Sequence, residues 1–133
     1  MIFDGGDVEF STTNLDDIGK AVASSLLKAG DVKNRSVYVH TAVVSQNQLL
    51  AFAKQSAPDG DYPVLHLDSA ELEKQAWTKW DAGERGPDVV RGFLPRATFG
   101  HQLGKFEKTD NDLLGIKQWN DDEIKDFVAS YVK

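Results

Sequence analysis

The chain has 133 residues, of which 41% are hydrophobic, and a formal net charge of -6. This length and apolar content fit one folded domain, and an acidic chain without a basic cluster argues against a nucleic-acid partner. The absence of cysteine excludes disulfides, thiolate catalysis and cysteine-ligated zinc, and it suits a reducing, cytoplasmic location. No stretch approaches the roughly 20 apolar residues of a membrane span, and the first residues carry no signal-peptide pattern.

The first predicted elements are a strand and a helix between residues 7 and 30. Acidic and apolar side chains alternate over residues 7–10, which is typical of a half-buried strand. Thr13, followed three residues later by Asp16, forms a capping-box pattern that predicts the start of a helix. Four apolar residues share one face of this helix, which predicts packing against a core: Leu15, Ile18, Val22 and Leu26.

The remaining chain continues to alternate strands and helices. Asn120 and Glu123 form the capping pattern of the last helix, and Pro95 should kink or split the helix in which it lies. The predicted strands are residues 35–44 and 62–68, and the predicted helices are residues 45–57, 70–83, 87–104 and 120–131. This order predicts a single α/β domain, residues 1–133, with helix in excess: a small, mostly parallel sheet and about five helices.

Motifs that carry chemistry are sparse in this sequence. A dinucleotide-binding turn needs three spaced glycines between a strand and a helix, and none of the glycine clusters has that spacing. His40 and His66 lie in predicted strands, where a packed, hydrogen-bonded histidine is commoner than a catalytic one. His101 follows a glycine in an aromatic region and is the more interesting of the three. No catalytic, cofactor-binding or metal-binding residue is predicted.

Residues 110–121 begin like a calcium-binding loop. Asp110 and Asp112 are followed by Gly115 at the sixth position, as such a loop requires. Leu114, however, occupies a position that needs an oxygen ligand, and Asp121 stands where the loop needs glutamate. We therefore expect a turn whose aspartate and asparagine side chains bond the nearby backbone.

Aromatic residues in the second half suggest where a small molecule could bind. Their rings offer apolar surface with a few polar tips, which is the usual character of such sites. The alternative is that they form ordinary core. The candidate pocket residues are Trp77, Trp80, Phe93, Phe99 and His101.

Three segments carry a resemblance to a known family. They are FSTTNLDDIGKAVASSLL (residues 10–27), NRSVYVHTAVVSQNQLLAFAKQ (residues 34–55) and DNDLLGIKQWNDDEIKDFV (residues 110–128). In this order and spacing they resemble the C-terminal portion of the NmrA-like and isoflavone-reductase-like family, which are atypical short-chain dehydrogenase relatives. The resemblance covers nearly the whole chain from Val8 onward.

The resemblance implies a division of roles between two halves. Full-length members look like a Rossmann-type NAD(P)-binding domain with a smaller substrate domain, and NADP is the implied cofactor. Residues 8–30 would be a late strand and helix of the Rossmann domain, and residues 31–133 mainly the substrate side. The family's glycine-rich loop, nucleotide-selecting basic residue and catalytic lysine have no counterpart here. We therefore expect a truncated form, without the cofactor-binding half, that binds no cofactor alone.

Three functions remain open at this point. The chain is the substrate-side portion of an NAD(P)-dependent reductase, a non-catalytic regulatory or binding module like NmrA itself, or a self-sufficient small enzyme. The last is least favoured because no acid–base pair or nucleophile pattern supports it. An unpaired strand edge at residues 8–11 and an uncovered sheet face would favour association. A homodimer is preferred over a partner protein or a rearrangement of residues 1–30.

Overall fold

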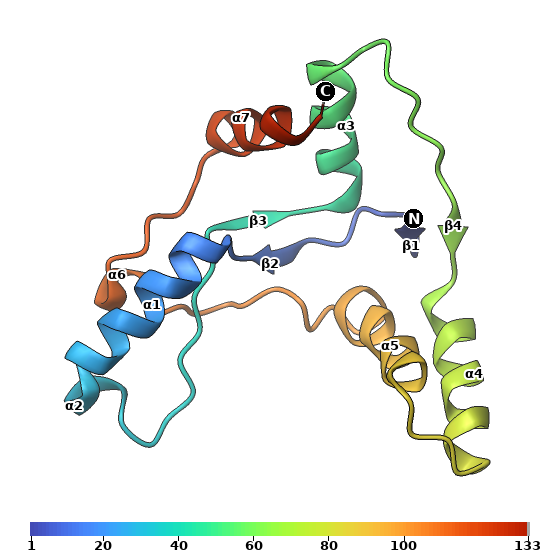
Figure 1. Cartoon of the computed structure of the whole chain (residues 1–133), viewed down its shortest axis with the longest axis horizontal. Coiled ribbons are helices and arrows are strands. Elements are labelled where there is room, and N and C mark those ends of the chain that lie inside the picture. The colour runs from blue at the N-terminus through green and yellow to red at the C-terminus, as the bar shows by residue number, and fades with distance from the viewer. Residues whose placement is uncertain (133) are drawn as a thin grey trace.

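The computed structural model describes residues 1–132. Helices predominate, as the sequence predicts (Figure 1). The strands are β1 (Ile2–Phe3), β2 (Phe10–Thr12), β3 (Ala42–Val44) and β4 (His66–Leu67). The α-helices are α1 (Leu15–Leu27), α2 (Ala29–Val32), α3 (Gln46–Ser56), α4 (Ser69–Asp81), α5 (Pro87–Pro95), α6 (Asn111–Leu114) and α7 (Asp121–Tyr131), and a π-helical segment, η1 (Arg96–Gly100), follows α5. The mixed α/β class with helix in excess is confirmed.

The strands form two separate pairs, so the prediction of one mostly parallel sheet is wrong. β1 pairs with β4 in parallel, with Ile2 opposite His66. β2 pairs with β3 in the antiparallel sense, with Phe10 opposite Val44. Each strand is only two or three residues long. A β-branched sequence favours extended backbone, but a strand also needs a neighbour to exchange hydrogen bonds with.

Of the strand predicted at residues 35–44, only β3 forms, because the rest has no neighbouring strand to pair with. Its first half has polar side chains and loop backbone as partners in place of a strand. The side-chain amide of Asn111 accepts a hydrogen bond from the His40 backbone N–H (3.1 Å) and donates one to the His40 carbonyl (2.7 Å). Asp110 donates its own backbone N–H to the Tyr38 carbonyl (2.7 Å) and accepts the Tyr38 N–H with its carboxylate (3.1 Å). These bonds satisfy the extended backbone without a sheet.

The same contacts determine the structure of the segment that begins like a calcium-binding loop, residues 110–121. Asn111–Leu114 is the short helix α6, and Gly115 ends it with a left-handed φ of 70°. Asp110 is also held by Arg35, whose Nη2 lies 2.8 Å from Oδ1. The side chains of Asp110 and Asn111 bond the backbone of Tyr38 and His40, so the prediction that they bond the nearby backbone is wrong. Among residues 1–132, no three acidic or histidine side chains gather in a way that could hold a metal ion.

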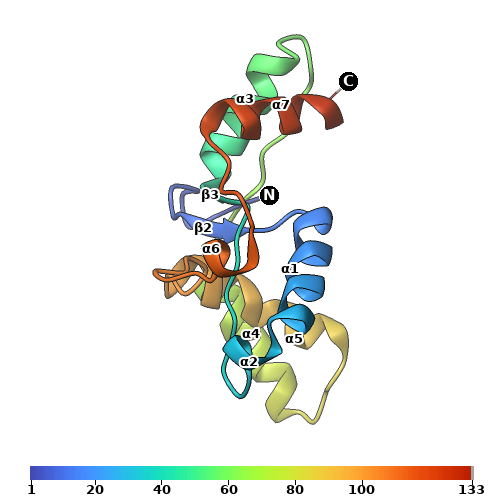
Figure 2. The same cartoon turned by 90° about the vertical axis from the view of Figure 1, so that its left-hand side faces the viewer.

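Two small apolar clusters stand in place of one continuous core. The first contains buried Ala21, Leu114 and Ile116, with Val32, Val37, Val39 and Leu113 packed around them. The second contains buried Ala42, Val44 and Ile124, with Phe10, Leu49, Phe52, Trp119 and Val128 around them. Figure 2 shows α3 and α7 on one side of the β2–β3 pair, with α1, α4 and α5 on the other. No helix in the described part of the chain is long and apolar enough to cross a membrane.

The α4–α5 hairpin forms a separate arm (Figure 1). Gly92 of α5 sits against Ala76 of α4, where an added Cβ would lie 2.7 Å from the Ala76 Cβ, so the two helices approach closely. α5 ends at Pro95, where α-helical geometry gives way to η1. The predicted interruption at this proline is confirmed, because proline cannot donate the hydrogen bond that an α-helix needs.

Helix α1 differs from the prediction in two ways. Its N-cap is Asn14, whose side chain accepts the Asp17 N–H, because the hydroxyl of Thr13 donates to the Val39 carbonyl instead. Its buried residues are Asp17 and Ala21. The predicted packing face points outward, and its four residues are exposed: Leu15, Ile18, Val22 and Leu26. The prediction that this face packs within the chain is therefore wrong.

Candidate functional site

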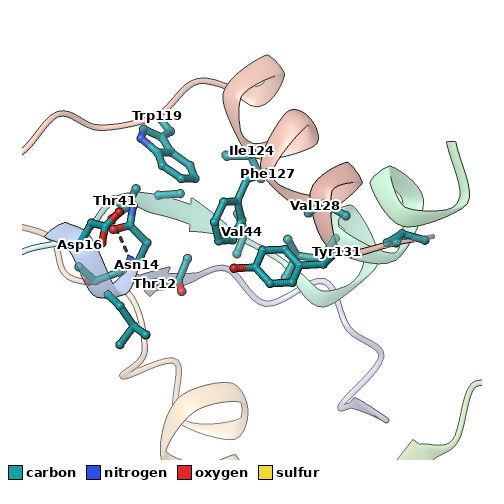
Figure 3. A pocket seen from close by; sticks show the side chains of 15 residues that line it. Thr12, Asn14, Asp16, Thr41, Val44, Trp119, Ile124, Phe127, Val128 and Tyr131 are labelled. Atoms are coloured by element: carbon teal, nitrogen blue, oxygen red, sulfur yellow. Dashed lines mark hydrogen bonds between the residues drawn. The ribbon is translucent and has the colours of Figure 1, made fainter. Parts of the chain in front are cut away.

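A groove of about 850 Å³ lies where the start of α1, the β2–β3 pair and α7 meet (Figure 3). We call it the α1–α7 groove. Most of its lining is apolar, and its polar groups gather near the start of α1. The lining residues are Thr12, Thr13, Asn14, Leu15, Asp16, Thr41, Ala42, Val44, Leu49, Trp119, Ile124, Phe127, Val128, Tyr131 and Val132.

Three aromatic rings line up along the α7 side of the groove. The centroid of the Trp119 ring lies 5.1 Å from that of Phe127, and the Phe127 centroid lies 5.1 Å from that of Tyr131. The backbone N–H of Trp119 donates to the Thr41 carbonyl (2.7 Å), which fixes the segment ahead of α7 against the strands. α7 then starts with a complete capping box of Asn120 and Glu123. The aromatic row therefore lies along a helix whose N-terminus is held in place.

The polar end of the groove is built around the buried carboxylate of Asp17. It accepts hydrogen bonds from the Thr41 hydroxyl (2.8 Å), the Lys20 ammonium (3.0 Å) and the Asn14 amide (3.1 Å). Burial alone raises the pKa of Asp17, but these bonds and the Lys20 charge outweigh it, so its pKa lies below the usual value. Asp17 is thus ionised at neutral pH and holds α1 against Thr41, the residue just before β3.

This lining suits binding rather than proton transfer. A ligand would meet aromatic and aliphatic walls along the groove and hydroxyl and amide groups at one end. The carboxylate of Asp16 and the phenol of Tyr131 are the ionisable groups of the lining. The best-fitting ligand is therefore uncharged and largely apolar, with a hydrogen-bonding group at one end.

The pocket residues predicted from sequence lie outside the α1–α7 groove, and they do not form one cluster. Trp77 and Trp80 of α4 pack on Phe93 of α5, with centroid distances of 4.8 and 6.5 Å. Phe99 of η1 stacks on Phe3 and meets Phe10 edge-on, at 5.4 and 5.5 Å. His101 is exposed just beyond η1.

None of these five residues lines the α1–α7 groove, so the predicted pocket stays a prediction. Both tryptophans of α4 keep exposed surface, and Arg85 lies over the Trp80 ring with its Cζ 3.8 Å from the centroid. The α4–α5 cluster is therefore neither ordinary buried core nor part of the groove.

Sequence reasoning missed the groove although it found one of its walls. The helical period of the last helix shows that four apolar residues share one face: Ile124, Phe127, Val128 and Tyr131. Of these four, Ile124 is buried, whereas Phe127 and Tyr131 are exposed. Trp119 lies outside every predicted strand and helix, one residue before the last predicted helix. A run of aromatic residues at helical spacing with a tryptophan just before the N-cap was the available signal.

Comparison with known proteins relates the chain to oxidoreductases. It is 28% identical over 128 residues to oxidoreductase poxI of Penicillium oxalicum, covering 93% of this chain and 40% of that protein. It is 27% identical over 135 aligned positions to oxidoreductase aprR of Aspergillus flavus, covering 99% of this chain and 44% of that protein.

These similarities are distant and partial. The chain spans about two fifths of the length of the curated relatives it matches. No family model matches it, and no solved structure matches it. The chain is thus distantly related to part of two fungal oxidoreductases.

Proposed function

We propose that this chain is the substrate-side portion of an NmrA-like or isoflavone-reductase-like, NAD(P)-dependent reductase. The observation that carries the proposal is that nearly the whole chain matches less than half of two oxidoreductases. The chain then supplies a substrate surface, and the NADP-binding machinery belongs to the remaining portion of such an enzyme. On this proposal the chain alone is not catalytically competent.

The α1–α7 groove is the surface that would receive the substrate. Its volume lies within the range of 300–1,000 Å³ that is usual for small-molecule pockets. Its aromatic row offers an apolar wall, and the Thr12 hydroxyl and the Asn14 amide offer polar contacts at one end. The proposed substrate class is an uncharged, largely apolar molecule with a carbonyl or hydroxyl group at that end.

A second function rests on the chemistry of the same lining. The described residues of the groove bring together binding groups without an arranged acid–base pair. A regulatory module of the NmrA type would need only the binding step. The two functions differ in whether a completed enzyme turns over NADPH.

The neutral apolar dye Nile red tests the groove. The Trp119→Ala change removes part of the aromatic row, and we expect it to raise the dissociation constant at least fivefold in a fluorescence titration. The matched control is Trp77→Ala, which removes the same ring from α4, outside the groove. If Trp77→Ala weakens binding and Trp119→Ala does not, the site belongs to the aromatic cluster predicted from sequence.

A chimera tests the enzyme portion. In it, the matched region of poxI is replaced by this chain. We expect the chimera to bind NADPH in a calorimetric titration, and the chain alone to show no affinity tighter than about 100 µM. NADPH binding by the chain alone would contradict the proposed division of roles. NADPH binding by the chimera without oxidation of NADPH by any apolar carbonyl compound would favour the regulatory function.

A further inference from the structure

The threonine hydroxyls at the polar end of the α1–α7 groove differ in whether the protein itself uses them. The Thr13 hydroxyl donates to the Val39 carbonyl (3.1 Å), and the Thr41 hydroxyl donates to the buried carboxylate of Asp17 (2.8 Å). Thr12 is exposed, and its hydroxyl has no hydrogen-bond partner in the described part of the chain. Among the threonines of the lining, Thr12 is therefore the one whose hydroxyl is free to bond a ligand.

The phenol of Tyr131 approaches the same place from the opposite wall. Tyr131 is the last residue of α7, and its ring lies beside that of Phe127 in the lining of the groove. Figure 3 shows its hydroxyl pointing across the groove toward Thr12 of β2. This hydroxyl, too, has no hydrogen-bond partner among the residues that the structure describes, and Tyr131 is 75% exposed. Each wall of the groove thus presents one free hydroxyl.

The free groups at this end are mainly hydrogen-bond donors. Asn14 spends its side-chain carbonyl on the Asp17 N–H and one amide hydrogen on the Asp17 carboxylate, which leaves its second amide hydrogen. The Tyr131 phenol donates well and accepts poorly, because the ring withdraws electron density from its oxygen. The Thr12 hydroxyl donates or accepts. A carbonyl oxygen suits this set best, because its two lone pairs can accept from both walls at once.

The carboxylate of Asp16 restricts which ligands with such an oxygen are admitted. Asp16 is exposed, lines the groove and follows the first turn's Leu15, and no described residue forms an ion pair with it. The Lys20 ammonium is engaged by Asp17 (3.0 Å). A ligand carboxylate would offer the same acceptor oxygens as a ketone, but it would bring a second negative charge close to Asp16. Like charges repel, and apolar walls screen this repulsion less than open water does.

Resting on the proposed function, we propose that Thr12 and Tyr131 hold one neutral carbonyl oxygen of the ligand between them, and that Asp16 excludes the corresponding carboxylate. The ligand class is then a ketone, ester or amide on an apolar body, and the free acid is rejected. Trp119 and Phe127 contact the apolar body along the groove. Thr12, Tyr131 and Asp16 are specificity-determining residues in this arrangement, and no proton transfer is required of them.

The fluorescent naphthyl ketone Prodan tests the contact with the carbonyl. Its emission moves to longer wavelength when its carbonyl oxygen accepts hydrogen bonds, so affinity and hydrogen bonding are read in one titration. We expect Thr12→Val and Tyr131→Phe each to raise the dissociation constant about threefold, the usual value of one hydrogen bond, and to shift the emission of bound Prodan to shorter wavelength.

Two further variants control for a merely structural effect. Thr12→Ser keeps the hydroxyl and should restore both the affinity and the emission wavelength. Tyr38→Phe removes a phenol from a half-exposed tyrosine outside the groove, and it should change neither quantity. Unchanged emission in both Thr12→Val and Tyr131→Phe would show that the carbonyl does not lie between these residues. An equal shift in Tyr38→Phe would also overturn the proposal.

A carboxylate analogue of Prodan, with the propionyl group replaced by a carboxylate, tests the role of Asp16. We expect the unchanged chain to bind Prodan about tenfold more tightly than this analogue, and Asp16→Asn to reduce the difference to about threefold or less. The matched control is Asp88→Asn, which removes a first-turn aspartate of α5 outside the groove and should keep the difference. Equal affinity for both ligands in the unchanged chain would contradict exclusion by Asp16.

The two proposals can fail separately, because the ligand titrations need only the chain itself. If the titrations give the expected results and the chimera with poxI binds no NADPH, the carbonyl site stands and the proposed reductase function fails. If the chimera binds and oxidises NADPH while Thr12→Val and Tyr131→Phe leave Prodan binding unchanged, the reductase function stands and the carbonyl site fails.

Discussion

Helices α1 and α7 begin in the same way and lie in opposite environments. Each has an asparagine N-cap, Asn14 or Asn120, and an acidic first turn. α7 turns its apolar residue Ile124 into the core, whereas α1 buries a carboxylate and an alanine and exposes its apolar face. Helical period therefore identifies the apolar face of a helix. It does not tell whether the same chain supplies the surface that covers it.

The strongest test of this contrast compares two isoleucines. Ile124 is 5% exposed and Ile18 is 44% exposed. We expect Ile124→Ala to lower the free energy of unfolding by about 2–5 kcal/mol, the usual cost of emptying a core site. Ile18→Ala should cost less than about 1 kcal/mol, because little buried surface is lost. Urea unfolding followed by circular dichroism measures both, and equal losses would show that α1 packs within the chain.

The N-caps provide a second comparison. Replacing either cap by alanine should cost about 1 kcal/mol of unfolding free energy. We expect the larger loss for Asn14→Ala, because the Asn14 side-chain amide also donates a hydrogen bond to the buried carboxylate of Asp17 (3.1 Å). The same urea titration measures both variants. A larger loss for Asn120→Ala would mean that the polar anchor of α1 contributes little.

The smallest expected effect is the decline of the unfolding free energy at acidic pH. The folded-state pKa of Asp17 is lowered by its hydrogen bonds and Lys20, against the opposing effect of burial. Its stabilisation is therefore complete above the unfolded pKa of about 3.9 and is lost as pH falls through the lower folded value. We expect unfolding free energy to decline on acidification below about pH 5, and less steeply in Asp17→Asn than in the unchanged chain.

Glu123 of α7 offers the matched comparison for acid. Lys117 and the Asn120 N–H lower its pKa as well, but this carboxylate lies at the surface. Its contribution should therefore weaken at high salt, while the buried contribution of Asp17 persists. Unfolding measured at several pH values, at 0.1 and 1 M salt, separates the two. Identical salt dependence for Asp17→Asn and Glu123→Gln would contradict a buried anchor.

The parts of the fold that the sequence predicted are those decided by local interactions. Ser45 caps α3, and Asn120 with Glu123 caps α7, as their spacing indicates. Strand pairing depends on partners distant in sequence, so the run at residues 35–44 gave no warning that Asn111 would replace a neighbouring strand. The N-cap of α1 is Asn14 and not the predicted Thr13, because the Thr13 hydroxyl donates to the carbonyl of Val39, which is distant in sequence.

The candidate site could be predicted only in part for the same reason. The aromatic face of α7 is visible in the sequence, but the groove exists because this face lies across from Thr12 and Asn14, more than 100 residues earlier in the chain. The tryptophans of α4 attracted attention as aromatic residues, and their packing with Phe93 depends on the close approach of α4 and α5 at Gly92. The residue types were evident, and their grouping in space was not.

The contacts around α6 have a consequence for synthesis of the chain. The hydrogen bonds between Asn111 and His40 join residues 71 positions apart, and the buried cluster beneath α1 needs Leu114 and Ile116. During translation, α1 leaves the ribosome about 90 residues before these supports, at the usual elongation rate of about 5–20 residues per second. For several seconds its apolar residues therefore belong to a helix without its support.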